Sequence, residues 1–190
     1  MKIYSLISLL LVSVLLLGCL NAPTQSEQLN QTSEINSSVN QTMELKLQTF
    51  KAPTFTINYP IDWKEETSNY DLTDEYTFTP TADGDASGVI VSIQKYSTRA
   101  PPTLQELKAI QKTKENQYAT ITSSEEVKFQ NKNALKTTFK INTDALNGMI
   151  QTDYHLIIGA NLYKLTYLVV ENDTQTVAKL EQMINSIKIN

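Results

Sequence analysis

Residues 55–63 read FTINYPIDW, and this stretch carries the clearest signal for the fold. Apolar and polar side chains alternate up to Tyr59, which is the period-two pattern of a strand with one buried face. Pro60 ends the alternation, and we predict a turn or a short helix at residues 61–64. Tyr59 and Trp63 are interpreted as aromatic plugs at one end of a sheet, with an aromatic recognition patch as the alternative.

The chain that follows this strand shows further strand patterns and two helix patterns. Thr103 and Glu106 form a capping box at the start of the first helix, and Asp173 is the predicted N-cap of the second. The loops between the later strands are short, which favours antiparallel neighbours. These elements predict an α+β fold in which helices pack against a sheet. The expected strands cover residues 75–79, 89–96, 121–129, 134–142, 149–159 and 162–170, and the expected helices cover residues 104–118 and a segment from 174 onward.

Residues 55–63 also resemble the opening of the PsbP-like family, in which an aromatic strand, a Tyr-Pro step and a tryptophan follow one another. The strand LYKLTY at residues 162–167 leads into a helix that finishes MINSIKI at residues 183–189, much like the closing helix and final short strand of that family. The likeness spans about residues 50–190. It implies an α/β/α sandwich with a central, mostly antiparallel sheet.

The best-known members of the PsbP-like family are extrinsic, non-enzymatic subunits of the oxygen-evolving complex of photosystem II. They assist assembly and the retention of calcium or chloride. The resemblance therefore implies a non-enzymatic accessory role for this chain. The photosystem function itself is not carried over, because no residue here matches a functional site of those subunits and fold likeness alone does not assign function.

Cys19 is the only cysteine, and it follows Lys2 and an uncharged, mostly apolar run at residues 3–18. This order predicts a cleaved signal peptide at residues 1–18. The sequence LLGC at residues 16–19 resembles the lipobox of prokaryotic lipoproteins, in which the cysteine becomes the first mature residue and carries lipid such as palmitate. A transmembrane anchor is an alternative, although the run is shorter than the ~20 residues of a spanning helix; a plain secretory signal is another. We expect a protein anchored by lipid on the extracytoplasmic face of the cell membrane.

Residues 19–49 follow the signal and are rich in Asn, Gln, Ser and Thr. Such a segment buries too little apolar surface to fold, so we predict a disordered tether that leads to a globular domain at residues 50–190. Four sequons are potential N-glycosylation sites, at Asn30, Asn36, Asn40 and Asn172. A composition of this kind also produces sequons by chance.

Composition limits the chemistry and the partners of the domain. With Cys19 committed to lipid, no thiol remains for a disulfide, a zinc-thiolate site or a cysteine nucleophile. The formal net charge of −4 gives no electrostatic reason to bind nucleic acid or anionic lipid. We therefore expect no nucleic-acid partner.

Asp83, Asp85 and Ser87 place side-chain oxygens at the spacing of half an EF-hand calcium loop, with Gly88 at the sixth position. The twelfth position, however, is Gln94 and not a bidentate glutamate. Asp and Gly are also the residues that a hairpin turn requires. A plain turn is the favoured interpretation, and a weak calcium site is the alternative.

His155 is the only histidine, and strand alternation places Asp153 on the same face. A general base or a metal ligand needs a positioned set of partners, and the sequence offers no second histidine and no nucleophile pattern. We interpret His155 as a solvated or partly buried strand residue. The acidic residues Asp71, Asp74 and Glu75 are interpreted as a solvated loop, with paired catalytic carboxylates as the alternative.

The sequence thus predicts a non-enzymatic, lipid-anchored extracytoplasmic protein whose domain binds or helps to assemble a membrane-associated protein complex. A calcium- or small-ligand-binding accessory lipoprotein is the first alternative. A hydrolase with an unrecognised site is the second. No cofactor is expected apart from the calcium of the first alternative, and the partners are the membrane, through the lipid, and a protein in or at the membrane.

Overall fold

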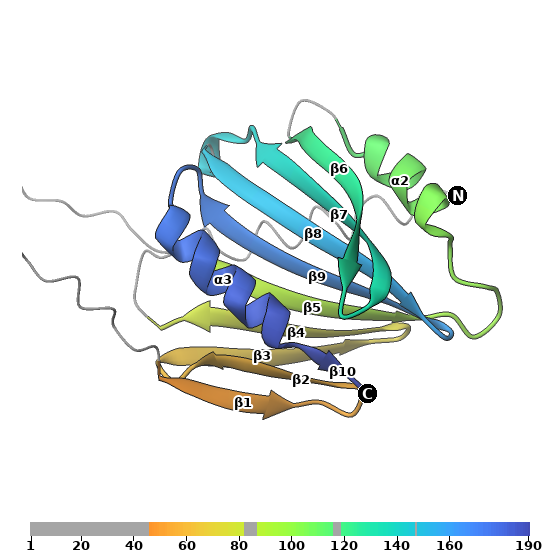
Figure 1. Ribbon diagram of the computed structural model, residues 1–190, viewed down its shortest axis with the longest axis horizontal. Helices are drawn as coiled ribbons and strands as arrows, with labels where there is room; N and C mark the ends of the chain where they lie inside the picture. Colours follow the sequence, from red (N-terminus) through yellow and green to blue (C-terminus); the bar gives the residue numbers. More distant parts are fainter. Residues whose placement is uncertain (1–45, 82–86, 116–118, 147) are drawn as a thin grey trace, which may run out of the picture. The chain divides into compact units, whose positions relative to one another are not determined.

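The computed structural model describes residues 46–81, 87–115, 119–146 and 148–190, all within one unit, Met43–Asn190 (Figure 1). The two helices are α2, Leu104–Lys112, and α3, Thr174–Ser186, and a single 3₁₀ turn covers Asp144–Leu146. The strands are β1 Leu47–Lys51, β2 Phe55–Pro60, β3 Trp63–Tyr70, β4 Thr73–Pro80, β5 Gly88–Lys95, β6 Ala119–Phe129, β7 Lys132–Ile141, β8 Met149–Ile158, β9 Asn161–Val170 and β10 Lys188–Ile189.

The strands form two antiparallel sheets. The larger has seven strands in the order β3-β4-β5-β9-β8-β7-β6, and the smaller has three in the order β1-β2-β10. Every strand pair in both sheets is antiparallel. The predicted meander of β6 to β9 is therefore confirmed, and β9 also pairs with β5, which lies far away in the sequence.

The helices cover opposite faces of the larger sheet. Helix α3 contacts β5 and β9 on one face, together with β2 of the smaller sheet, whereas α2 contacts β6, β7 and β8 (Figure 1). The main core lies on the α3 side, and a small cluster of Leu107, Leu135 and Leu162 lies on the α2 side. This arrangement confirms the predicted α/β/α sandwich. Because α2 has only nine residues, it covers β6 to β8 and leaves the neighbouring strands open on its side.

Helix α2 begins at the predicted capping box, in which Thr103 and Glu106 bond each other's backbone amides. It ends at Lys112, earlier than predicted. The amides of Thr113 and Lys114 bond the carbonyls of Ile110 and Gln111, three residues back, and these tight bonds end the helix. Lys114 therefore lies outside the helix, just after its C-cap residue Thr113.

Two edge strands depart from the sequence prediction. Leu47–Lys51 forms β1, so strand structure extends into the end of the segment that we predicted as tether. Residues 61–64 were predicted as a turn or a short helix, but only Ile61 and Asp62 form the turn, and Trp63 opens β3. The seven residues of β3 that follow Trp63 are all exposed, so this strand shows no alternation of apolar and polar residues.

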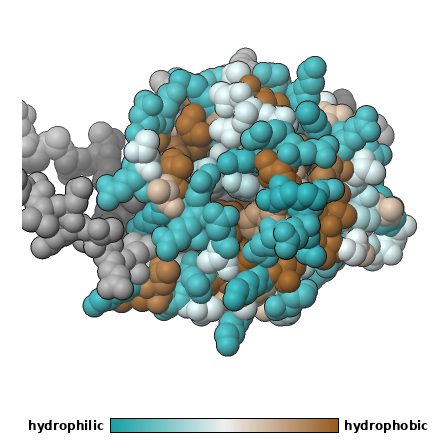
Figure 2. All heavy atoms as spheres, viewed as in Figure 1, coloured by the Kyte–Doolittle hydropathy of each residue, from teal (hydrophilic) through white to brown (hydrophobic). Residues whose placement is uncertain are grey.

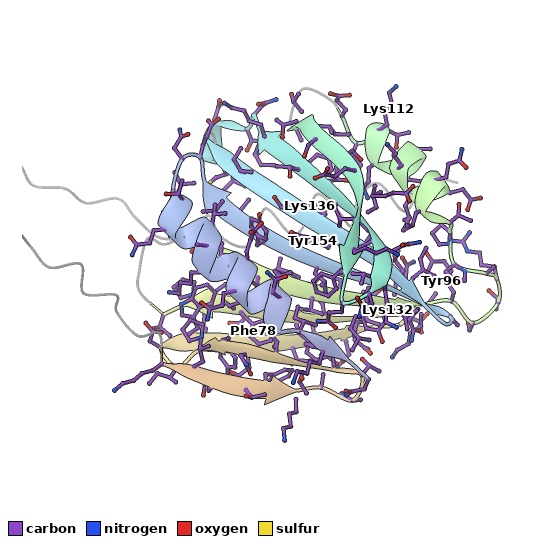
Figure 3. The ribbon with its side chains drawn as sticks, viewed as in Figure 1. Phe78, Tyr96, Lys112, Lys132, Lys136 and Tyr154 are labelled. Carbon is purple, nitrogen blue, oxygen red and sulfur yellow. The ribbon has the colours of Figure 1, made fainter. Side chains whose placement is uncertain are left out.

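Aromatic side chains join the two sheets. The ring of Phe78, in β4, lies 5.5 Å from Phe50 of β1 and 5.1 Å from Tyr59 of β2, measured between ring centroids (Figure 3). Tyr59 and Trp63 are each 4% exposed and belong to the main core. They are therefore packing residues, as the favoured interpretation predicted, and not a recognition patch.

Candidate functional site

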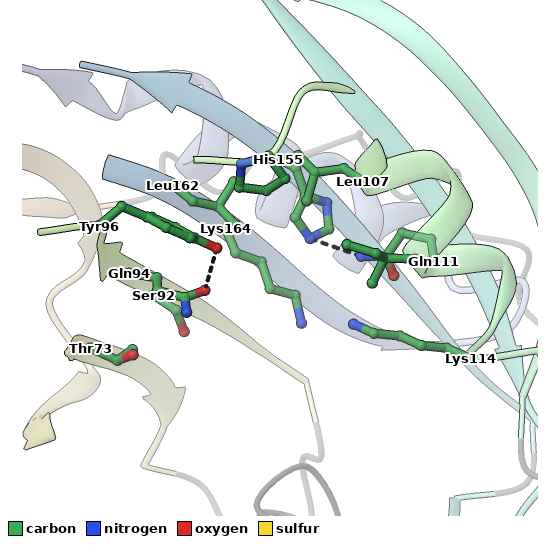
Figure 4. Close-up of a pocket in the computed structure, with 12 residues that line it drawn as sticks. Thr73, Ser92, Gln94, Tyr96, Leu107, Gln111, Lys114, His155, Leu162 and Lys164 are labelled. Atoms are coloured by element: carbon green, nitrogen blue, oxygen red, sulfur yellow. Dashed lines mark hydrogen bonds between the residues drawn. The ribbon is translucent and has the colours of Figure 1, made fainter. Parts of the chain in front are cut away.

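A pocket of about 230 Å³ lies where α2 ends, on the face of the large sheet that this short helix leaves partly open (Figure 4). Its floor comes from β4, β5, β8 and β9, and its side from α2 and the residues around it. The polar and charged lining residues are Thr73, Ser92, Gln94, Tyr96, Gln111, Lys114, His155 and Lys164, and the apolar ones are Pro102, Leu107, Ile110 and Leu162.

The register of the sheet produces the polar floor. Ser92 of β5 pairs with Lys164 of β9, which in turn pairs with His155 of β8, so these three residues lie in one row across the sheet. The next row toward the pocket mouth contains Gln94 and Leu162. Since directly paired residues point to the same face of an antiparallel sheet, the row presents three polar side chains to the α2 side.

His155 is 2% exposed, so it is more buried than we predicted. Its Nε2 lies 3.1 Å from the amide Nε2 of Gln111 on α2. In the orientation in which the amide nitrogen of Gln111 faces the ring, this nitrogen donates and Nε2 of His155 accepts. The imidazole is then neutral, with its proton on Nδ1. Burial lowers the pKa of His155 to about 4 against the opposing charge of Asp153, and the charges of Lys164 and Lys114 add smaller lowering effects.

Asp153 is a buried charge behind the floor of the pocket, 1% exposed and on the same strand face as His155, as predicted. Its Oδ1 accepts hydrogen bonds from Gln151 Nε2 at 2.9 Å and from Thr166 Oγ1 at 2.8 Å. Its Oδ2 lies 3.2 Å from Lys164 Nζ. Burial alone would raise the pKa of Asp153, but Lys164 and the hydrogen bonds outweigh it and hold the pKa below its ordinary value.

Lys114 supplies a second positive charge. Figure 4 shows the ammonium groups of Lys114 and Lys164 pointing toward one another across the pocket. Loss of water around the ammonium group lowers the pKa of Lys114, and repulsion by Lys164 adds to the effect. The site therefore brings two positive charges together, Lys164 from its floor and Lys114 from its side.

The hydrogen bonds of Ser92 and His155 go to other residues, so the two side chains do not form a nucleophile–base pair. Ser92 Oγ donates to Glu75 Oε2 at 3.1 Å, whereas His155 Nε2 is engaged by Gln111. An imidazole with a pKa near 4 is also a poor general base at neutral pH. The geometry suits binding better than it suits proton transfer.

The three acidic residues Asp71, Asp74 and Glu75 have separate roles. Asp71 lies in the exposed turn between β3 and β4, but Asp74 and Glu75 belong to β4, which corrects the prediction of a common loop. Asp74 Oδ2 pairs with Lys95 Nζ at 2.7 Å, and Glu75 accepts the hydrogen bond from Ser92. They are not a pair of catalytic carboxylates.

Most of the other predicted modification and metal sites lie outside the described residues. This holds for the lipidation site Cys19, for the sequons at Asn30, Asn36 and Asn40, and for the loop residues Asp83 and Asp85. Ser87 is described and is 4% exposed. Asn172 is exposed in the turn before α3, with a φ of 70°.

Two features are absent from the described part of the chain. No three His, Cys, Asp or Glu side chains within it lie together as a metal site would require. Nor does any helix within it have the length and apolar character needed to cross a membrane.

A family profile described as PsbP-like protein matches residues 3–189. The chain belongs to the PsbP-like family. The resemblance predicted from residues 55–63 and from the closing helix is thereby confirmed. No curated protein matches the sequence.

Solved structures extend this result to the fold. The solution structure of cyanobacterial PsbP (CyanoP) from Synechocystis sp. PCC 6803 superposes with a TM-score of 0.57 at 12% sequence identity, covering 82% of this chain and 99% of that one. A crystal structure of a protein from Bacteroides thetaiotaomicron VPI-5482 gives a TM-score of 0.52 at 16% identity, covering 75% of this chain and 48% of that one. At such identities the likeness concerns the fold.

The sequence indicated only one of the residues that build the pocket. His155 stood out as the sole histidine, and its face was predicted correctly. Lys164 and Ser92 were missed because their place beside His155 depends on the pairing of β5 with β9. Lys114 was missed because the helix was predicted to continue past it.

Proposed function

We propose that this PsbP-like protein is a non-enzymatic accessory protein, held on the extracytoplasmic face of the cell membrane by lipid on Cys19, whose folded domain binds a protein of a membrane-associated complex. The observation that supports the accessory role is membership of the family over residues 3–189. The sequence LLGC at residues 16–19 supports the anchor. The polar segment that follows would hold the domain at a distance from the lipid.

One face of the domain fits a reversible partner. On the face seen in Figure 2, hydrophilic residues predominate and hydrophobic ones form separate small patches. Large continuous apolar patches are typical of obligate interfaces, whereas smaller and more polar interfaces are typical of transient ones. We therefore propose a partner that associates and dissociates.

Replacement of Cys19 by serine should release the protein from the membrane or leave its signal unprocessed. Serine cannot carry the lipid, and the folded region begins well after residue 19, so the domain should stay intact. Membrane fractionation with a mass measurement of the N-terminus tests this expectation. A Cys19→Ser protein that is processed normally and stays firmly membrane-bound would contradict lipid anchoring.

Amine-reactive crosslinking in intact membranes tests the partner. We expect one adduct of defined mass with a membrane protein or a subunit of a membrane complex. The adduct should form in lower yield with the Cys19→Ser variant, because release from the membrane lowers the effective concentration of the two proteins. Absence of a discrete adduct, or an equal yield from the released variant, would count against the proposal.

A further inference from the structure

The pocket beneath α2 is positively charged, and this charge is not balanced within it. None of its described lining residues is acidic. Lys164 is neutralised from below by Asp153, at 3.2 Å. Lys114, in contrast, has no carboxylate within ion-pair distance among the residues that the structure describes. One positive charge is therefore left over at the side of a partly enclosed cavity, on a lysine that solvent can reach.

The amide of Gln111 is a second group whose binding capacity is unused. Gln111 is 2% exposed, and its Oε1 has no hydrogen-bond partner within the described structure. A buried polar atom without a partner costs free energy, so an occupant of the cavity would be stabilising. Rotation of the amide by half a turn would direct its N–H groups to such an occupant, while Oε1 accepted from the His155 ring.

Apolar side chains also line the pocket. Leu107 and Leu162 are buried in the small cluster on this side of the sheet, and Ile110 lines the pocket although it is 47% exposed. The volume of about 230 Å³ is smaller than the roughly 300–1,000 Å³ of sites for drug-sized ligands. The space suits a small molecule with one charged end and one apolar end.

We propose that this pocket binds a small organic carboxylate, whose charged group pairs with Lys114 and Lys164 and whose apolar body packs against Leu107, Ile110 and Leu162. This inference does not depend on the protein partner proposed above. It would make the domain a carrier or sensor of such a molecule.

Benzoate is a suitable probe, because it combines one carboxylate with one apolar ring. Since His155 is the only histidine, its ring signals in a ¹⁵N-histidine NMR spectrum of the full-length protein in mild detergent report on the pocket alone. We expect a saturable shift of these signals with benzoate. The neutral analogue benzamide and inorganic phosphate should each bind at least tenfold more weakly, because each lacks one of the two features.

Matched variants locate the binding. Lys114→Met should weaken benzoate binding by roughly tenfold to a hundredfold, the size of a charge-assisted interaction. Lys112→Met is the control, because Lys112 is exposed on the outer side of the same helix and does not line the pocket (Figure 3). Ile110→Ser should weaken the binding of benzoate several-fold and leave the binding of acetate unchanged.

The proposal is overturned by any of three results. Benzamide that binds as tightly as benzoate would show that the lysines do not recognise the negative charge of the carboxylate. Phosphate that binds more tightly would indicate a site for inorganic anions. Equal affinities of the Lys114→Met and Lys112→Met variants, both folded by circular dichroism, would place the carboxylate elsewhere.

Discussion

Replacement of Lys164 by alanine should lower the free energy of unfolding by about 1–3 kcal/mol, because the buried carboxylate of Asp153 loses its counter-charge while the lysine side chain itself is 31% exposed. Asp153 is 1% exposed, and its Oδ2 faces Lys164 Nζ at 3.2 Å. Without the lysine, the carboxylate keeps only the hydrogen bonds from Gln151 and Thr166. These bonds do not supply the opposite charge. Urea denaturation at pH 7 measures the loss.

The pair Lys140–Glu171 provides the control. Its atoms are 2.8 Å apart, but the two side chains are 42% and 38% exposed. Solvent screens such a pair, so Lys140→Ala should cost less than about 1 kcal/mol. A Lys164→Ala variant that loses no more stability than Lys140→Ala would show that Asp153 does not depend on Lys164.

A double variant separates the ion pair from simple packing. If the cost of Lys164→Ala comes from an unpaired carboxylate, then adding Asp153→Asn should recover part of the lost stability. The carboxamide carries no charge and can still accept from Thr166. The alternative outcome is additivity, in which the double variant loses the sum of the stability losses of the two single variants. Additive losses would point instead to the packing of the lysine stem.

The strands with one deeply buried face were predictable from sequence. In β9, Tyr163 and Leu165 are buried on the α3 side, and Lys164 between them faces the pocket on the other side. Helix α3 was predictable for the same reason, since Leu180 and Ile184 lie on its buried face. The periodic spacing of apolar residues identifies such elements, because one face of each is buried in the core.

The edge strands were not predictable, for the opposite reason. Strand β3 is exposed over seven residues, and β1 is mostly exposed, so neither shows a buried face. Strand β10 has two residues, which pair with Phe55 and Thr56 from the far end of the domain. Pairing over such a separation depends on the whole fold and leaves no local pattern, so only the resemblance to the PsbP-like family indicated this final strand.

The pocket combines both situations. Strand alternation correctly placed His155 and Asp153 on one face. The sequence did not show that α2 would bury this face, so His155 was expected to be more exposed than it is. Lys164 lies beside His155 because β8 pairs with β9, and Lys114 lies at the pocket because α2 ends just before it and packs on this face of the sheet. Both placements depend on tertiary structure. A site assembled in this way becomes visible only when the register is known.

The burial of His155 predicts that stability falls as the pH is lowered from about 6.5 toward 4. The unfolded chain binds a proton on this imidazole near its ordinary pKa of about 6.5, whereas the folded protein resists protonation until the pH reaches about 4. Between these values the unfolded state holds more protons, so stability decreases with falling pH. The slope is at most about 1.4 kcal/mol per pH unit, and the total is about 3 kcal/mol.

A His155→Gln variant tests the origin of this slope, because it removes the only histidine of the chain. Urea denaturation at several pH values between 7 and 4 should show a much flatter profile for the variant, whatever its stability at pH 7. Asp153 does not confuse the result. The pKa of Asp153 is lowered in the folded protein. Its contribution to stability is therefore complete above pH 3.8, its ordinary pKa, and is lost only as the pH falls below that value. Equal slopes for the two proteins would mean that water reaches His155 in the folded state and that the pocket floor is more open than the packing of α2 indicates.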